Sequence, residues 1–253
     1  MTAPFLSAHD VTVQFGGLTA VDSVSVAVAR GELVGVIGPN GAGKSTLFNA
    51  LAGTVALAGG SVRIEGTDVS DWRPERRARA GVARTFQRLE VFGSMTVREN
   101  LLYATEAAAL AERPWRLLAR RRYQDDALVD EVLTLVGLAG DADRPVAELP
   151  TGQARIVEFA RAVCARPAVV LLDEPSSGLD AAETAALTAA ARDAAQRWGF
   201  GILLVEHDLS MVFDLCTWLH VLDFGCLIAS GPTREVAELD RVRDAYLGAV
   251  DAG

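Results

Sequence analysis

The sequence predicts an α/β fold built on a parallel sheet. Residues 33–37, 169–172 and 202–205 form three short, continuous apolar runs, which is the pattern of strands buried on both faces. Residues 181–198, between the last two runs, have the composition of a helix. A strand, a helix and a second strand in that order imply parallel pairing, with the helix covering the sheet.

The first ninety residues predict strands of a second kind. Val11, Val13 and Phe15 alternate with polar residues, and valines alternate with other residues again over 24–28, after the turn Gly16-Gly17. Such alternation is typical of strands with one buried face. Residues 61–65 and 82–86 are expected to form further short strands.

The middle of the chain has a helical composition. From about Thr96 to Leu149 the sequence is rich in alanine and arginine and lacks a strand pattern, so we expect a helical insert in the α/β core. Two arginine-rich runs, 73–79 and 116–122, are interpreted as solvated helix faces, and contact of the first with a membrane partner is the alternative. No internal repeat or low-complexity linker divides the chain.

Composition excludes several classes of protein. The 253 residues are 50% hydrophobic and 23% charged, as in a folded chain, and the net charge of -9 argues against broad nucleic-acid binding. The sequence has no run of 18 apolar residues, so we expect no membrane span. The first residues also lack the pattern of a signal peptide. Cys164, Cys216 and Cys226 lie in apolar runs and are expected to be buried free thiols in a reducing cytoplasm.

One motif predicts phosphate binding. The apolar run 33–37 continues into Gly38-Pro39-Asn40-Gly41-Ala42-Gly43-Lys44-Ser45-Thr46, which matches G-x-x-x-x-G-K-[ST]. Glycines allow successive backbone N–H groups to surround one anion, and a helix that starts near Gly43 adds the positive end of its dipole. Lys44 then reaches the β- and γ-phosphates of a nucleotide, and the Ser45 hydroxyl can bind Mg²⁺.

The lysine of this motif is the only lysine in the chain. Of the 24 basic residues, 23 are arginine and one is Lys44. A guanidinium group is a wide planar fork, whereas an ammonium group is a compact point charge. We therefore expect the cavity around Lys44 to be sized for the ammonium group.

Polar side chains follow two of the predicted buried strands. Asp173 is suited to hold Mg²⁺, usually through water, and Glu174 is suited to act as general base for an attacking water. His207, after the next strand, is placed to contact the γ-phosphate and orient that base. An exposed strand end without a catalytic role is the alternative. His9 and His220 lie in strand-like stretches and are interpreted as structural residues.

Together these motifs resemble the ATP-binding subunit of an ABC transporter over nearly the whole chain. The resemblance implies an α/β fold with a phosphate-loop (RecA-like) core, an antiparallel β subdomain and an inserted α-helical subdomain. Residues 1–253 would then form a single ABC ATPase domain. Within it, 1–95 and 154–253 make the α/β core with its β subdomain, and 96–153 make the helical subdomain.

The resemblance also assigns roles to residues. It implies ATP and Mg²⁺ as cofactors, Glu174, His207 and Gln87 as catalytic residues, and Ser45, Gln87 and Asp173 as metal ligands. Gln87 ends Arg-Thr-Phe-Gln, which is similar to the family's Q-loop. Phe15 stands where the family places an aromatic ring against adenine, and a place in the core is the alternative. The nucleotide-binding set is expected to be Phe15, Gly38, Asn40, Gly41, Ala42, Gly43, Lys44, Ser45, Thr46, Thr151, Gly152 and Gln153.

Residues 149–153 read Leu-Pro-Thr-Gly-Gln and differ at two positions from the family's signature loop, Leu-Ser-Gly-Gly-Gln. The usual serine donates a hydroxyl to the γ-phosphate bound on the opposite subunit, and Pro150 cannot do so. Either the Thr151 hydroxyl or the backbone N–H groups of residues 151–153, before an expected helix at 154–164, would take its place.

Further stretches narrow the resemblance. Residues 15–21, 84–87, 91–100 and 245–248, with the Leu-Pro-x-Gly-Gln loop, are similar to the branched-chain amino-acid importer type, a group that includes urea and amide importers. That type implies a second ATP-binding subunit (a copy or a paralogue), two transmembrane permease subunits and an extracytoplasmic substrate-binding protein, without nucleic acid. It also implies a peripheral place on the cytoplasmic side of the membrane. An ABC ATPase acting on ribosomes or DNA, and a phosphate-loop kinase, are rival interpretations.

Overall fold

The computed structural model of the chain describes residues 3–85, 89–112, 125–207, 209–240 and 242. The strands are β1 (Leu6–Phe15), β2 (Leu18–Val28), β3 (Leu33–Ile37), β4 (Gly59–Ile64), β5 (Thr67–Asp68), β6 (Val82–Arg84), β7 (Val169–Asp173), β8 (Gly201–Val205), β9 (Trp218–Asp223) and β10 (Cys226–Pro232). The helices are α1 (Lys44–Ala52), α2 (Pro74–Arg79), α3 (Val97–Glu112), α4 (Asp126–Leu135), α5 (Thr151–Cys164), α6 (Ala181–Trp198), α7 (Leu209–Leu215) and α8 (Thr233–Ala237), with short 3-10 helices η2 (Ala139–Asp141) and η3 (Val146–Glu148).

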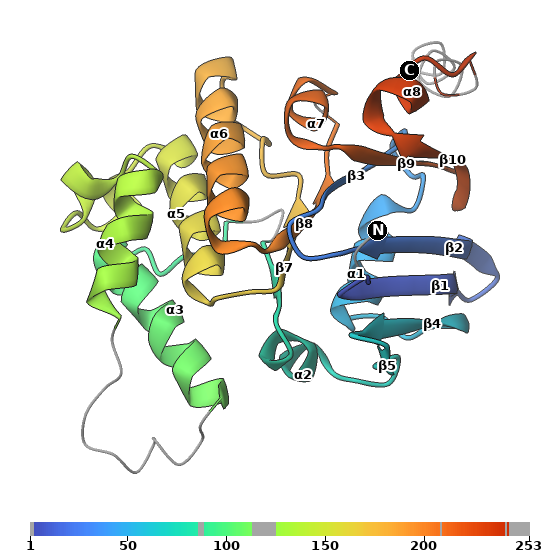
Figure 1. Ribbon diagram of the computed structural model, residues 1–253, viewed down its shortest axis with the longest axis horizontal. Coiled ribbons are helices and arrows are strands. Elements are labelled where there is room, and N and C mark those ends of the chain that lie inside the picture. Colours follow the sequence, from blue (N-terminus) through green and yellow to red (C-terminus); the bar gives the residue numbers. More distant parts are fainter. Residues whose placement is uncertain (1–2, 86–88, 113–124, 208, 241, 243–253) are drawn as a thin grey trace.

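The described strands form two sheets (Figure 1). A mixed sheet has the order β10-β9-β3-β8-β7-β6, and an antiparallel sheet has the order β2-β1-β4-β5. In the mixed sheet the neighbours from β6 to β9 pair in parallel, and β10 joins β9 as an antiparallel hairpin. The predicted α/β fold, with a parallel core and an antiparallel β part, is therefore confirmed.

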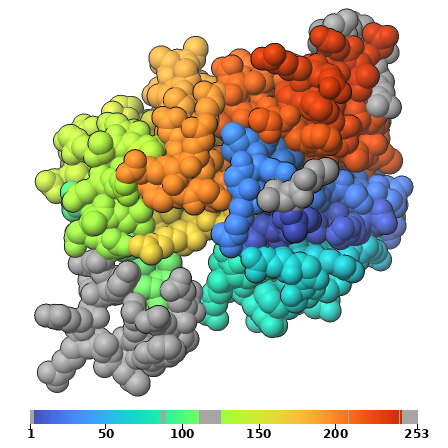
Figure 2. Space-filling model, viewed as in Figure 1, coloured from blue at the N-terminus to red at the C-terminus, as the bar shows by residue number. Residues whose placement is uncertain are grey.

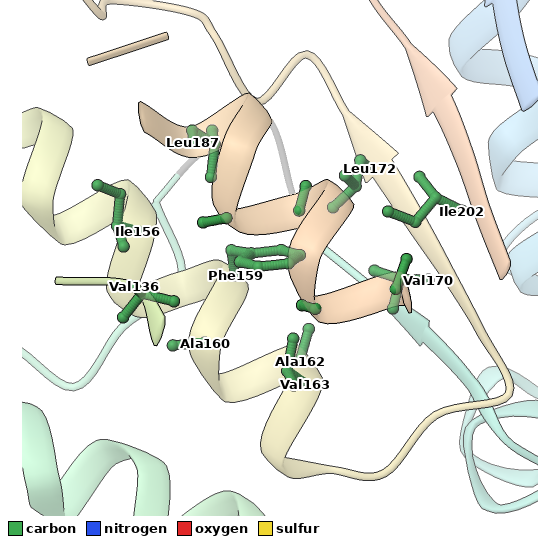
Figure 3. Packing of buried hydrophobic residues seen from close by; sticks show 14 of the residues in the cluster. Val136, Ile156, Phe159, Ala160, Ala162, Val163, Val170, Leu172, Leu187 and Ile202 are labelled. Atoms are coloured by element: carbon green, nitrogen blue, oxygen red, sulfur yellow. The ribbon is translucent and has the colours of Figure 1, made fainter. Parts of the chain in front are cut away.

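The central strands are buried on both faces because successive side chains enter two different hydrophobic clusters. Val170 and Leu172 of β7 pack against α5 and α6, as Figure 3 shows around Phe159. The alternate residues, Val169 and Leu171, face α1 and the antiparallel sheet. Each fully buried valine or leucine contributes about 1.5–3 kcal/mol, so the continuous apolar runs stabilise both layers at once.

Helices occupy the middle of the chain, as its composition predicts. α3, α4, η2 and η3 lie between residues 97 and 148, and α3 and α4 pack beside α5. Figure 1 shows α3 and α4 on the side of the molecule away from the antiparallel sheet, and Figure 2 shows the same part of the chain there in green. Within the ranges that the structure describes, no helix is both long and apolar enough to cross a lipid bilayer. The arginine-rich run 116–122 lies outside the described residues.

The bounds of α5 and α6, which precede β7 and β8, can be compared with the bounds expected from the sequence. α6 has the predicted bounds and begins with a capping box, in which Asp180 and Glu183 each accept a hydrogen bond from the other's backbone N–H. The helix expected at 154–164 begins three residues earlier, at Thr151. Pro150 precedes it with extended backbone angles (φ -55°, ψ 152°), so residues 151–153 form the first turn of α5.

The interpretation of residues 73–79 as a solvated helix face is wrong for Arg77. The run does form α2, but Arg77 is only 1% exposed. Its guanidinium donates hydrogen bonds to the carbonyl oxygens of Ala50 and Leu51, both at 2.7 Å, and of Ser70 at 2.9 Å. Ala50 and Leu51 lie in the last turn of α1, so a buried cation satisfies the negative end of that helix.

The three cysteines are free thiols, and two of them are buried as expected. Burial raises the pKa of Cys164 and of Cys216 to about 12. Cys226 contradicts the expectation because it is exposed. It is the first residue of β10, which lies at the edge of the mixed sheet directly after a tight turn.

His220 is a buried structural histidine. It lies on β9 between Val36 of β3 and Ser230 of β10, and it is 6% exposed. Its Nδ1 atom has no hydrogen-bond partner in the described part of the chain. Burial lowers the pKa of His220 from 6.5 to about 4, because the charged imidazolium would be poorly solvated there.

This shift predicts a pH dependence of stability. In the unfolded chain His220 binds a proton near pH 6.5, whereas in the folded chain it binds one only near pH 4. The contribution of neutral His220 to the free energy of unfolding is therefore fully present above pH 6.5 and is lost as the pH falls below that value. Between pH 7 and pH 5, His220→Leu should lose about 2 kcal/mol less unfolding free energy than the wild type. Urea unfolding at the two pH values measures this, and equal losses would contradict the assignment.

Candidate nucleotide-binding site

The predicted phosphate loop connects β3 to α1 and is held by close backbone contacts. Gly38 has φ 154°, and a Cβ atom there would lie 2.1 Å from the carbonyl oxygen of Leu222. Gly43 has φ 98° at the N-cap of α1, and a Cβ atom there would lie 2.4 Å from the carbonyl oxygen of Ala20. Both positions therefore require glycine for backbone conformation and for space.

Lys44 lies inside the curl of this loop. Its Nζ atom donates hydrogen bonds to the carbonyl oxygens of Gly38 at 2.6 Å and Pro39 at 2.9 Å. Burial lowers the pKa of Lys44, and the negative charges of Glu174 and Asp173 oppose that shift. Two consecutive carbonyl groups thus converge on one compact ammonium group that lies near both strand-end carboxylates.

The carboxyl ends of β7 and β8 bring the predicted polar residues together. The Glu174 N–H continues the ladder by donating to the Val205 carbonyl oxygen at 2.9 Å. Glu174 has a left-handed backbone conformation (φ 48°), and its Oε1 atom lies 2.7 Å from Nε2 of His207. Such conformations are costly for a non-glycine residue and cluster at functional sites. The Glu174 carboxylate and the His207 imidazole therefore form a hydrogen-bonded pair.

Glu206 positions this pair and was not assigned a role from the sequence. It is 1% exposed. Its Oε1 atom accepts a hydrogen bond from the Ser176 N–H at 2.7 Å, and its Oε2 atom accepts one from the His207 N–H at 2.8 Å. It thereby joins the loop after β7 to the loop after β8. A carboxylate at the end of a fully apolar strand was the only sequence signal for it.

Arg84 holds Asp173 in place and was also missed as a functional residue. Its Nη2 atom lies 2.7 Å from Oδ2 of Asp173, and its Nη1 atom donates to Oδ1 of Asn49 at 2.8 Å. The side chains of Arg84 and Asp173 are 11% and 6% exposed. The contact arises because β6 pairs in parallel with β7, and that register is not visible in the sequence.

A pocket of about 500 Å³ lies over the loop. Its lining residues are Leu18, Thr19, Ala20, Asn40, Gly41, Ala42, Gly43, Lys44, Ser45, Thr46, Glu174, His207, Phe224 and Gly225. Phe15 is 53% exposed at the end of β1, beside Leu18, which excludes its alternative place in the core. Gly38 supports the loop through its contact with Lys44. Gln87 lies outside the described residues.

The predicted signature residues do not line this pocket. Thr151, Gly152 and Gln153 form the first turn of α5, against the start of α6. A Cβ atom on Gly152 would lie 2.1 Å from Oε1 of Glu183, the residue that closes the capping box with Asp180. A larger residue at position 152 would therefore force the Glu183 carboxylate out of the capping box. The structure does not bring these three residues to the phosphate loop of the same chain.

The residues around the loop fit a magnesium ion. Ser45 is exposed in the first turn of α1 and lines the pocket. Asp173 is buried next to Glu174, and its Oδ2 atom is held by Arg84. Hydroxyl and carboxylate oxygens are the ligands that Mg²⁺ prefers, and the Ser45 and Asp173 oxygens are of this kind.

A phosphate loop between a buried strand and a helix, with carboxylates at the ends of neighbouring strands, defines a phosphate-loop nucleotide-binding protein. Residues 21–177 match the family described as ABC transporter. The chain therefore belongs to the ABC transporter family, as one of its ATP-binding cassettes.

Relatives and solved structures resemble nearly the whole chain. The high-affinity branched-chain amino acid transport ATP-binding protein BraF of Pseudomonas aeruginosa is 36% identical over 98% of this chain and 99% of its own. LivG of Salmonella typhimurium, named in the same way, is also 36% identical, with the same coverage of both chains. The ADP conformation of MJ1267, an ATP-binding cassette of an ABC transporter, has a TM-score of 0.83 at 29% identity, covering 98% of this chain and 100% of that chain.

The buried pair of Arg84 and Asp173 predicts a large effect on stability. Arg84→Met would leave the Asp173 carboxylate buried without its cation, so the free energy of unfolding should fall by about 3–5 kcal/mol. Arg98→Met is the matched control, because its partner Asp130 lies at 2.6 Å but is 60% exposed, and the expected loss is about 1 kcal/mol or less. Chemical unfolding measures both variants, and equal losses would contradict the prediction.

Proposed function

We propose that this chain is the ATP-binding and ATP-hydrolysing subunit of an importer for branched-chain amino acids. The observation that carries the catalytic part is the convergence of Lys44, Glu174 and His207 on one pocket above a phosphate loop. The names of BraF and LivG support branched-chain amino acids as the cargo, since both proteins resemble this chain over nearly its full length. Urea or amide uptake by the same type of subunit is the alternative cargo.

ATP binding follows from the geometry of the loop. Residues 40–46 line the pocket, so the backbone N–H groups at the start of α1 would donate to the phosphates and α1 would add the positive end of its dipole. Lys44 exchanges its bonds to the Gly38 and Pro39 carbonyls for the β- and γ-phosphate oxygens. Phe15, which is exposed at the end of β1, provides a ring for adenine.

Hydrolysis is assigned to the Glu174–His207 pair. The Glu174 carboxylate accepts a proton from water as the water oxygen attacks the γ-phosphorus, and the bond to the ADP oxygen breaks. His207, at 2.7 Å from Glu174, orients the carboxylate and lies beside the γ-phosphate. A Mg²⁺ ion held by Ser45 and Asp173, with Gln87 as a further ligand, would neutralise charge on the phosphates.

A second ATP-binding subunit, identical or paralogous, would complete the site. Residues 151–153 form the first turn of α5, where the backbone N–H groups have no partner within the helix, and such a helix start suits a γ-phosphate bound on the partner subunit. Pro150 lacks an N–H group, so Thr151 and the backbone supply the contact. ATP binds both surfaces only in the closed dimer, which shifts the population toward closure.

A cleft of about 680 Å³ offers a place for a permease segment. It lies between α2 and β6 on one side and α3 and α5 on the other, and its lining is largely apolar. Phe92 and Tyr103 line it and are 38% and 48% exposed. We propose that one of two transmembrane permeases docks there. We also propose that residues 1–253 are a single ABC ATPase domain, in which the helical subdomain, 96–153, moves relative to the α/β core formed by 1–95 and 154–253.

This docking would hold the chain peripherally on the cytoplasmic side of the membrane. An extracytoplasmic substrate-binding protein would deliver the cargo to the permeases, and no nucleic acid takes part. The support is the transport function named for BraF and LivG and the apolar cleft in this chain.

Glu174→Gln tests the catalytic assignment. The amide keeps the shape of the side chain but cannot accept the proton, so ATP hydrolysis should fall by about a hundredfold or more while ATP binding is retained. The variant should also accumulate as a closed dimer with ATP, measured by light scattering after gel filtration. Glu235→Gln, an exposed change on α8, is the control. Normal turnover by Glu174→Gln would refute the base assignment.

Tyr103→Arg tests the permease cleft. A charged side chain in the apolar cleft should abolish co-purification of two hydrophobic permeases from membranes, while ATP binding stays unchanged. Phe213→Arg changes an aromatic side chain of similar exposure on α7, outside the cleft, and should leave co-purification intact. Mass spectrometry of the purified material measures both. Recovery of ribosomal proteins alone with the wild type would overturn the transport assignment.

A further inference from the structure

The turn between β9 and β10 has an unfavourable residue at its first position. Asp223 pairs with Cys226, so Phe224 and Gly225 form a two-residue hairpin loop. Both have positive φ, 42° and 80°, which is the type I′ conformation. That turn prefers Asn-Gly or Asp-Gly, because a bulky side chain is strained at positive φ.

Packing within the chain does not offset this strain. Phe224 is 89% exposed, the most exposed of the large hydrophobic residues in the described part of the chain. An exposed ring gains little from burial, so neither turn chemistry nor the core explains a phenylalanine here. A locally disfavoured residue without an internal compensation indicates a role outside the fold.

The turn is held directly against the phosphate loop. The Gly225 N–H donates to the Ala42 carbonyl oxygen at 3.1 Å, and the Gly225 carbonyl oxygen accepts from the Asp22 N–H at 2.8 Å. Phe224 and Gly225 line the same pocket as Lys44. The ring is therefore positioned by main-chain bonds at the rim of the candidate nucleotide site.

The pocket has a polar part and an apolar part. Residues 40–46 and the Glu174–His207 pair surround the phosphates, whereas Leu18 and Ala20 from β2 and Phe224 from the β9–β10 turn form an apolar wall. Leu18 is 67% exposed, so this wall presents open hydrophobic surface beside the loop. A nucleotide has the same division, with charged phosphates at one end and a flat nucleoside at the other.

We propose that Phe224 is a nucleotide-contacting residue that packs its ring against the nucleoside part of bound ATP. The proposal rests on the proposed function and adds to it a second aromatic contact, supplied by a different hairpin from that of Phe15. Covering the exposed ring on binding offsets the strain of the turn. The residue thereby distinguishes a complete nucleotide from a bare polyphosphate.

Phe224→Asn restores the preferred Asn-Gly turn and removes the ring. The variant should unfold at a temperature about 2–4 °C higher, because the strain is relieved. Its Kd for ATP should rise about tenfold through loss of the ring contact, while its Kd for inorganic tripolyphosphate should stay unchanged. Phe224→Tyr, which keeps a ring, should retain ATP affinity. Calorimetry on the monomeric chain measures each Kd.

Glu65→Asn is the matched control. Glu65 and Gly66 form another two-residue turn with positive φ, 48° and 77°, between β4 and β5, and neither lines the pocket. This variant should gain stability without a change in ATP affinity. Equal ATP affinity in Phe224→Asn and the wild type would overturn the proposal, as would weakened dimer formation alone, which would place Phe224 in a subunit contact. Failure of the proposed function would give a different result from failure of this proposal, since the wild type itself would then not bind ATP.

Discussion

Close approach of backbone to backbone around the phosphate loop is the constraint on which the site depends. The Leu222 carbonyl occupies the space of a Gly38 side chain, and the Ala20 carbonyl occupies that of Gly43. The loop is therefore shaped from outside, by β2 and by the end of β9, as well as by its own glycines. This rigid frame allows one ammonium group, that of Lys44, to satisfy two consecutive carbonyls before any ligand binds.

The parallel sheet brings functional residues that are far apart in the sequence close together in space. Because β6, β7 and β8 are parallel and adjacent, their carboxyl ends lie at one edge of the sheet. Arg84, Asp173 and His207 come from three separate stretches, yet each stands directly at, or just beyond, the end of its strand. The buried ion pair and the Glu174–His207 pair follow from this shared edge, which is where open α/β sheets bind ligands.

Local pattern predicted most of the fold, and long-range register accounts for what it missed. Apolar runs identify the central strands because burial on both faces leaves no polar position, and a G-x-x-x-x-G-K-[ST] motif identifies the loop. The roles of Arg84 and Glu206 in holding Asp173 and the Glu174–His207 pair depend on the pairing of β6 with β7 and of β7 with β8, which the sequence does not reveal. Arg77 was misread because a helix face with several arginines is solvated on average, whereas this one meets the open carbonyls of α1. Phe224 was missed because an isolated ring carries no periodic signal.

The turn after β9 also places the exposed cysteine, Cys226, beside the pocket. Cys164 and Cys216 are buried and their pKa values lie near 12, so at neutral pH they remain protonated and shielded from reagents. Cys226 is exposed and is separated from Phe224 by one residue. Alkylation would therefore attach a fluorophore at one native position beside the pocket, which makes the natural chain suitable for site-specific labelling without removal of its other cysteines.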